Sequence, residues 1–251
     1  MKFILLQWNL FCTSVMFLSR IPLYPTEFRE EYLNESAGYF PLTGMLIGFL
    51  SGSVYYGASF FFSTSVSVIL SMCFSVLITG AFHEDGFTDF CDGFGGGYGD
   101  REKIIQIMKD SRIGAFGTVG ISLLLILKWQ LLSELPKDRI FLSIISAHSL
   151  SRAVLLYFLR TDEYAAENGK SKPMAKKISY SGLLFGTLIS AVPLFLFRNE
   201  KIFLCIIPLT VFKILYSSYL RKRLGGYTGD CLGAAQQIAE VLLYMSLLKL
   251  L

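Results

Sequence analysis

Three aspartates stand at helical spacing in the stretch 83–97, which reads HEDGFTDFCDGFGGG. Asp85, Asp89 and Asp92 would project from one face of a helix. Carboxylates stacked in this way repel one another, and the next cation along the chain is Arg101. Because hard oxygen ligands favour Mg²⁺ or Mn²⁺, the pattern predicts a divalent-metal site of the kind used in phosphoryl chemistry.

Glycines dominate the residues that follow, 93–99. Glycine lets backbone N–H groups approach and surround phosphate oxygens, so a phosphate-binding loop is predicted. A flexible linker has a similar composition, and no Lys-Ser/Thr pair closes the stretch as in a P-loop. The position of this stretch directly after the aspartates favours a phosphate-binding loop over a linker.

A short amphipathic helix is predicted next, with Asp100 as its N-cap and apolar residues at helical spacing. Lys109, Ser111 and Arg112 follow its end. We interpret the two cations as groups that hold a polyphosphate opposite the metal. The alternative is a snorkelling cluster at a membrane interface.

Long apolar blocks must position these residues. The chain has 251 residues, of which 53% are hydrophobic and 17% charged. A membrane-spanning helix needs about 20 residues, and seven blocks reach that range. We predict an all-α, polytopic integral membrane bundle of about seven transmembrane helices, forming a single domain over 1–251. The first block either lies in the interface or adds an eighth span. The blocks are 3–18, 39–62, 64–82, 113–133, 140–159, 179–197, 202–220 and 231–250.

Most Lys and Arg residues fall in four loops, 19–38, 83–112, 160–178 and 221–230. The positive-inside rule places these loops in the cytoplasm, including the active-site loop at 83–112. The five cysteines show no paired spacing and are interpreted as buried apolar residues. No basic patch interleaved with aromatic residues is present, so no nucleic-acid partner is expected.

Charged residues also occur inside the apolar blocks. Arg152, four residues after His148, is a functional candidate because charge within a span is costly. Lys128 and Lys213 are interpreted as snorkelling residues without a role. A cation transporter that uses Arg152, Lys213 and Glu240 as a relay is the non-enzyme alternative. Because the carboxylates gather at the cytoplasmic end of a block, an enzyme is favoured.

The stretch 83–97 resembles the H-x-D-G-x-x-D-x-x-D-G-x-G-G-G motif of the cobalamin synthase family. Further blocks look like those of this family and occur in the same order over nearly the whole chain. One departure is Glu84, where an apolar residue is common, which leaves open whether Glu84 touches metal. The further blocks are 17–22, 39–44, 108–117, 151–152 and 225–235.

This resemblance implies a reaction. In this family the ribose hydroxyl of α-ribazole, or of its 5′-phosphate, attacks the cobinamide phosphate of adenosylcobinamide-GDP. GMP leaves, and adenosylcobalamin or its 5′-phosphate forms, which is the last nucleotide-loop step of vitamin B12 synthesis. The family depends on Mg²⁺ and works in the prokaryotic cytoplasmic (inner) membrane. A homo-oligomer and a complex with other cobalamin-pathway enzymes are both compatible with the sequence.

The resemblance also implies residue roles. Asp85, Asp89 and Asp92 would hold Mg²⁺, and His83 or one of the aspartates would be the general base. A metal-bound aspartate is a poorer base, which favours His83 or a metal-free Asp92. The CDP-alcohol phosphotransferases of lipid synthesis are the rival enzymes, but the Ala-Arg of their motif does not follow Gly93. The residues expected to contact substrate or phosphate are Gly95, Gly96, Gly97, Lys109, Ser111, Arg112, Arg152 and Asp230.

Overall fold

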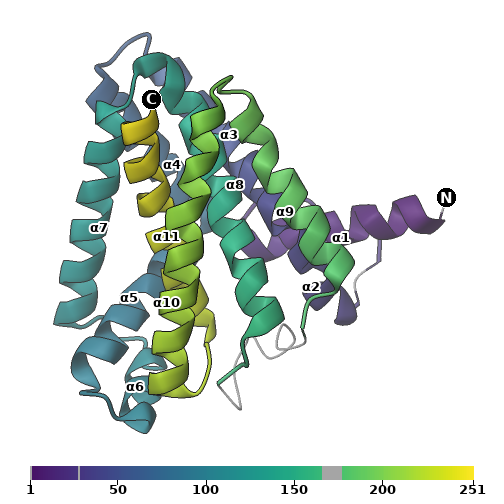
Figure 1. The fold of residues 1–251 in the computed structure, drawn as a ribbon, viewed down its shortest axis with the longest axis vertical. Coiled ribbons are helices and arrows are strands. Elements are labelled where there is room, and N and C mark those ends of the chain that lie inside the picture. Colours follow the sequence, from purple (N-terminus) through teal and green to yellow (C-terminus); the bar gives the residue numbers. More distant parts are fainter. Residues whose placement is uncertain (1, 28, 166–176) are drawn as a thin grey trace.

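The computed structural model describes residues 2–27, 29–165 and 177–251. These residues form helices and no β-strand, and one isolated bridge pairs Tyr164 with Tyr227. The prediction of an all-α fold is confirmed (Figure 1). The elements are α1 (Lys2–Leu18), α2 (Glu31–Glu35), the 3-10 helix η1 (Ser36–Tyr39), α3 (Phe40–Ala58), α4 (Thr64–Thr79), α5 (Phe82–Gly96), α6 (Arg101–Met108), α7 (Ala115–Glu134), α8 (Lys137–Thr161), α9 (Tyr180–Phe195), the 3-10 helix η3 (Glu200–Cys205), α10 (Ile206–Leu224) and α11 (Gly229–Leu250).

Helix α8 lies at the centre of the bundle and packs against α3, α9 and α11. Glycines allow α3 to approach it closely. A Cβ atom on Gly44 would lie 2.1 Å from the carbonyl oxygen of His148, and one on Gly48 would lie 2.7 Å from Cα of Ile145. Small residues at such crossings are typical of helix packing in membranes, where close backbone contact stabilises the pair.

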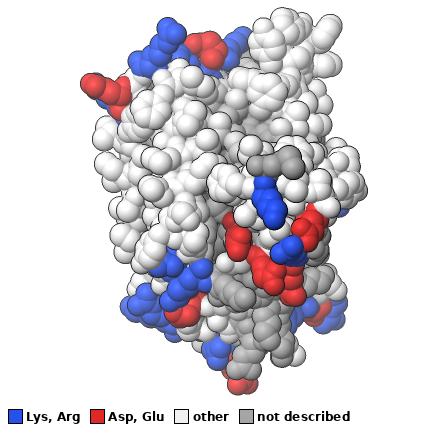
Figure 2. Space-filling view, turned by 90° about the vertical axis from the view of Figure 1, so that its right-hand side faces the viewer, with Lys and Arg blue, Asp and Glu red and all other residues white. Residues whose placement is uncertain are grey.

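The outer surface carries a band suited to lipid. In Figure 2 a broad region without charged side chains separates a charged rim at the top from charged side chains in the lower part. Within the described residues, five helical segments are long and apolar enough to cross a membrane. Helices α4 and α5 together would supply a sixth. The prediction of a polytopic membrane protein is therefore confirmed.

The described residues hold five or six segments that satisfy the length and hydropathy of a span, compared with the prediction of about seven. Helices α1 and α9 are apolar but have only 17 and 16 residues, which is shorter than the roughly 20 residues of a span. Figure 1 shows α1 running crosswise to α7 and α10. This direction favours an interfacial position for the first block over an eighth span.

A sharp turn separates α4 from α5. Gly80 and Ala81 both have positive φ angles, of 68° and 58°, and the two helices meet at 89°. The first residues after the turn begin the acidic stretch, so α5 leaves the direction of α4 and lies across one end of the bundle (Figure 1). The turn therefore decides where the aspartates are presented.

Helix α6 is amphipathic, as predicted, and buries Ile104 and Met108. Asp100 is its N-cap, accepting hydrogen bonds from the backbone N–H groups of Glu102 and Lys103 at 2.9 and 3.2 Å. The predicted cytoplasmic loop 83–112 is thus mostly helical, in agreement with the helical spacing of its aspartates and with the amphipathic helix predicted after Asp100. Apolar contacts of α5 and α6 with the bundle stabilise the two helices.

Three of the four basic loops meet at this end of the molecule. Arg101 donates hydrogen bonds to the carbonyl oxygens of Leu224 and Ala165, at 2.8 and 3.1 Å. These contacts join α6 to the segments that follow α10 and α8. Residues 166–176, most of the basic loop 160–178, lie outside the described residues.

Candidate active site

The acidic helix α5 crosses the first turn of α11 in backbone contact. A Cβ atom on Gly86 would lie 3.1 Å from Cα of Asp230 and 3.2 Å from Cα of Gly233. Glycine at both positions therefore permits the crossing. It brings Asp230, which is distant in sequence, beside the aspartates of α5.

Four carboxylates gather at this crossing. Asp89 is within electrostatic reach of Asp85, Asp92 and Asp230, and Asp85 also acts on Asp230. Within the described residues, none of the four forms an ion pair with a cation. The family resemblance implies that Asp230 contacts substrate or phosphate. Only the crossing of the two helices brings it to α5.

The chemistry of this cluster suits a hard cation. Like charges held close together are stabilised by a divalent ion, and carboxylate oxygen is the ligand Mg²⁺ prefers. Across the described part of the chain, no three acidic, histidine or cysteine side chains already converge as a metal cage. Mg²⁺ does not require one, since it keeps several waters and uses one or two carboxylates together with substrate phosphates.

Asp92 has a structural task of its own. Its side chain is buried, and its two oxygens accept hydrogen bonds from the backbone N–H groups of Gly114 and Gly117, at 2.7 and 2.8 Å. These groups belong to the start of α7, which would otherwise lack a side-chain cap. Asp92 therefore ties α7 to α5. Its predicted metal and base roles stay predictions.

The glycine stretch is not a loop, because α5 continues to Gly96. Its glycines allow close packing instead. A Cβ atom on Gly95 would lie 2.4 Å from the Phe116 ring, and one on Gly97 would lie 2.3 Å from Ile104 and 2.7 Å from the carbonyl oxygen of Gly93. Helical backbone N–H groups are already used within the helix. The phosphate contacts of Gly95, Gly96 and Gly97 thus stay predictions.

The turn between α6 and α7 carries the expected cations. Lys109, Ser111 and Arg112 are all exposed. Arg112 donates to Asp110 at 2.6 Å, and these hydrogen bonds lower the pKa of the Asp110 carboxyl. An exposed pair of this kind is weak and exchanges partners readily. Because Gly114 contacts Asp92, this turn ends beside the acidic cluster.

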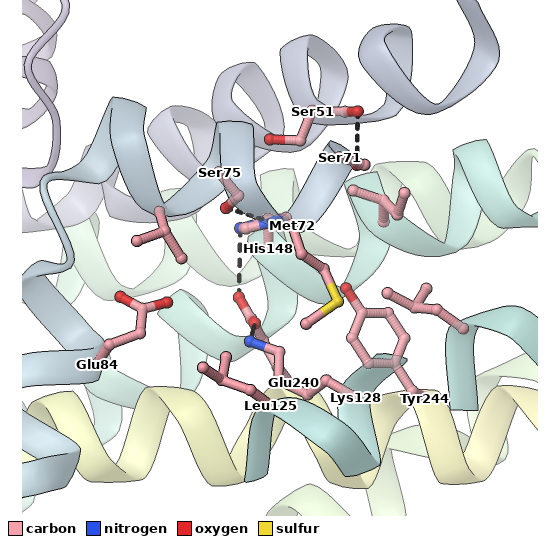
Figure 3. Close-up of a pocket in the computed structure, with 13 residues that line it drawn as sticks. Ser51, Ser71, Met72, Ser75, Glu84, Leu125, Lys128, His148, Glu240 and Tyr244 are labelled. Carbon is pink, nitrogen blue, oxygen red and sulfur yellow. Dashed lines mark hydrogen bonds and ion pairs between the residues drawn. The ribbon is translucent and has the colours of Figure 1, made fainter. Parts of the chain in front are cut away.

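A second polar cluster lies inside the bundle (Figure 3). Lys128 of α7 forms a buried ion pair with Glu240 of α11. The same carboxylate lies 3.2 Å from Nδ1 of His148 and 3.8 Å from Nη1 of Arg152. Lys128 also donates to Gln237 at 2.9 Å. Lys128 does not snorkel, contrary to the prediction, because its partner Glu240 is buried with it.

Arg152 belongs to this interior cluster. It is 1% exposed, and Nη1 donates to the carbonyl oxygen of His148 at 2.8 Å. The structure thus places Arg152 among Glu240 and His148 rather than beside Lys109 and Arg112. Lys213 lies apart from this cluster and pairs with Asp162 at 2.8 Å, so the predicted relay of Arg152, Glu240 and Lys213 is not continuous.

His83 also faces away from the carboxylates. It is 2% exposed, and the charged groups that act on it electrostatically include Arg152, Glu240 and Lys128 of the interior cluster. Its Nε2 atom has no hydrogen-bond partner among the described residues. The structure therefore does not bring His83 together with Asp85, Asp89 and Asp92, although the residues are close in sequence.

These features define a polytopic helical membrane protein with a cluster of four carboxylates at one end of its bundle. Comparison with known proteins gives the class a name. Residues 10–248 match the family model described as cobalamin-5-phosphate synthase, and the chain belongs to this family.

Individual relatives agree over nearly the full length. The chain is 42% identical to an adenosylcobinamide-GDP ribazoletransferase of Shewanella piezotolerans, with 96% of this chain and 95% of the relative covered. Proteins of the same name from Ralstonia pickettii and Leptospira biflexa are each 40% identical; the alignments cover 96% and 98% of this chain and 96% and 97% of those relatives. No solved structure matches the chain.

Proposed function

We propose that this protein joins adenosylcobinamide-GDP to α-ribazole, or to its 5′-phosphate, with release of GMP. The ribose hydroxyl attacks the cobinamide phosphate, the bond from that phosphate to GMP breaks, and the hydroxyl proton passes to a base. The observation that carries the proposal is the group of four carboxylates at the crossing of α5 and α11, which have no cation partner among the described residues, in a chain of this family.

We assign each residue a role from its position. Asp85 and Asp89 would hold Mg²⁺, which when bound supplies positive charge opposite the pyrophosphate oxygens. Asp230 faces them from α11 and accepts the hydroxyl proton. Lys109 and Arg112 bind phosphate charge from the neighbouring turn. Asp92 maintains the geometry by capping α7.

We also propose that the protein works in the prokaryotic cytoplasmic membrane, with the end formed by α5 and α6 in the cytoplasm. The support is the distribution of cations. Arg101, Lys103, Lys109 and Arg112 lie at this end, together with the 221–223 run of Arg and Lys, and Lys and Arg accumulate on the cytoplasmic side of membrane proteins.

The test is GMP release by purified protein in detergent, given adenosylcobinamide-GDP, α-ribazole and Mg²⁺. We expect one cobalamin product per GMP, with loss of activity in EDTA and in Asp89→Asn. Asp138→Asn is the matched control, because this exposed aspartate at the start of α8 forms an ion pair with its sequence neighbour Arg139. A folded wild-type protein that releases no GMP, or that acts on a CDP-alcohol instead, would overturn the proposal.

A further inference from the structure

A second cavity lies beside the acidic crossing, on the side where His83 is buried. It is lined by residues of α1, α3, α5, α8 and α11, and the space between these walls is about 430 Å³, part of which is open to solvent. Gly229 and Gly233 of α11 form part of its wall and flank Asp230 in sequence. The cavity is therefore continuous with the backbone that presents one of the four carboxylates.

The walls of the cavity are largely aromatic. Phe17 stacks on Phe40 with ring centroids 5.8 Å apart, and it meets Phe82 edge to face at 5.3 Å. Leu155 and Leu159 of α8 also line the cavity. Surfaces of this kind bind a flat, uncharged ring system by burial and edge or face contacts.

One unpaired polar atom indicates that the cavity binds a ligand. His83 is 2% exposed, and its Nε2 atom has no hydrogen-bond partner in the described part of the chain. Leaving a buried polar group unpaired is energetically costly. Among the described residues that line the cavity, only His83 and Tyr227 carry polar side chains. The cavity thus offers an apolar surface and very few hydrogen-bonding groups.

We infer that this cavity binds the fused aromatic base of the ribazole acceptor, with His83 donating from Nε2 to the ring nitrogen that carries no hydrogen. The inference rests on the proposed function and names a subsite for it. The ribose attached to the base then extends past Gly229 toward Asp230 and Asp85. In this arrangement His83 binds substrate and does not take the hydroxyl proton.

The alternative occupant, the guanine of adenosylcobinamide-GDP, fits poorly. Guanine presents several donors and acceptors on its edges. Most of them would lose water without gaining a partner in a cavity that offers the polar atoms of His83 and Tyr227. The ribazole base is a benzimidazole with methyl groups and one acceptor nitrogen. Its apolar surface and single acceptor therefore match the apolar walls of the cavity and the one donor of His83.

The test separates binding from catalysis. Equilibrium titration of α-ribazole into purified protein, without adenosylcobinamide-GDP, should give a dissociation constant that rises about tenfold in His83→Phe, since a lost hydrogen bond and unpaired ring nitrogen cost on the order of 1–3 kcal/mol. Leu155→Phe should weaken ribazole similarly by filling the cavity. Neither change should alter KM for adenosylcobinamide-GDP.

The control is Leu150→Phe on the same helix, because Leu150 lines a different cavity, between α8, α9 and α10. Free 5,6-dimethylbenzimidazole should compete with ribazole in wild type and in this control, but weakly in Leu155→Phe. Wild-type affinity for ribazole in both cavity variants would overturn the inference, and so would a fall in kcat alone for His83→Phe. Failure of the proposed function would appear separately, as absence of GMP release by the wild type.

Discussion

Gln237 donates a hydrogen bond from Nε2 to Oε1 of Glu84 over 2.9 Å. This contact joins the interior ion-pair cluster to the beginning of the acidic helix, because Gln237 also accepts from Lys128 and Glu84 immediately precedes Asp85. Figure 3 shows Glu84 directed toward the cavity that Lys128 and Glu240 line. Glu84, the residue that departs from the family pattern, is thus held by protein contacts.

The buried pair of Lys128 and Glu240 should be essential for stability. Glu240→Gln leaves Lys128 and Arg152 without their shared counter-charge, and breaking a buried pair costs about 3–5 kcal/mol. We expect a clearly lower Tm in detergent. Glu134→Gln, an exposed change on α7, should have little effect. The double variant of Lys128→Met with Glu240→Gln should be more stable than Glu240→Gln alone; a lower Tm for the double variant would contradict this account.

Asp89 and Asp92 should differ in their response to metal. Asp92 caps α7, so Asp92→Asn should reduce the free energy of unfolding by the ~1 kcal/mol typical of a lost cap, and Tm should fall. The Mg²⁺ concentration needed for half-maximal GMP release should not rise. Asp89→Asn should raise this concentration at least tenfold or abolish activity. The measurement is a Mg²⁺ titration of initial rates. An equal Mg²⁺ requirement in Asp92→Asn and Asp89→Asn would restore Asp92 as a ligand.

Gly97 should tolerate no side chain. In Gly97→Ala the new Cβ would meet Ile104 and the carbonyl oxygen of Gly93, and the second contact is backbone that cannot move away cheaply. We expect lower Tm and reduced GMP release, because α6 would be displaced from α5. Gly57→Ala on α3 is the control. Its Cβ meets nothing within 4 Å, so it should stabilise by about 0.5–1 kcal/mol through helix propensity. Equal Tm changes in the two variants would refute the packing role.

Asp162 should make stability depend on pH. Burial alone would raise the pKa of its carboxyl, but hydrogen bonds from Lys213, Ser217 and Thr161 outweigh burial and lower it. The folded state therefore gains stability from the ionised carboxyl above the ordinary pKa of about 3.9, and loses it as pH falls through the lowered value. Asp162→Asn should lower Tm at pH 7, and the difference from wild type should persist to about pH 4 and shrink below it, as the carboxyl of the wild type becomes protonated. A constant difference would contradict this linkage.

The proposed orientation can be tested by labelling in intact cells. Ser111→Cys lies in the exposed turn after α6, and Lys201→Cys lies in η3, on the opposite side in the predicted topology. A membrane-impermeant maleimide applied from outside the cytoplasmic membrane should label Lys201→Cys, and should label Ser111→Cys only after the membrane is permeabilised. The unsubstituted protein is the control for its own cysteines. The opposite pattern would invert the topology.

The sequence alone determined the class of fold and those parts of the site that lie within a single helix. Apolar blocks of membrane length depend on composition, and the spacing of Asp85 and Asp89 on one helix face depends on the helical repeat, so both are local properties. Asp100 was recognised as an N-cap for the same reason. Local patterns could not reveal that the glycines after Asp92 continue α5, since their packing partners Ile104 and Phe116 come later in the chain.

The tertiary structure decided which distant residues meet. Asp230 joins Asp89 because α11 crosses α5 at paired glycines, and Lys128 faces Glu240 because α7 packs beside α11. His83 is buried and acts with the interior cluster, although the aspartates beside it in sequence gather at the crossing. These relations depend on the angle and register of helices far apart in the chain, and helical periodicity specifies the direction of a side chain but not its partner on another helix.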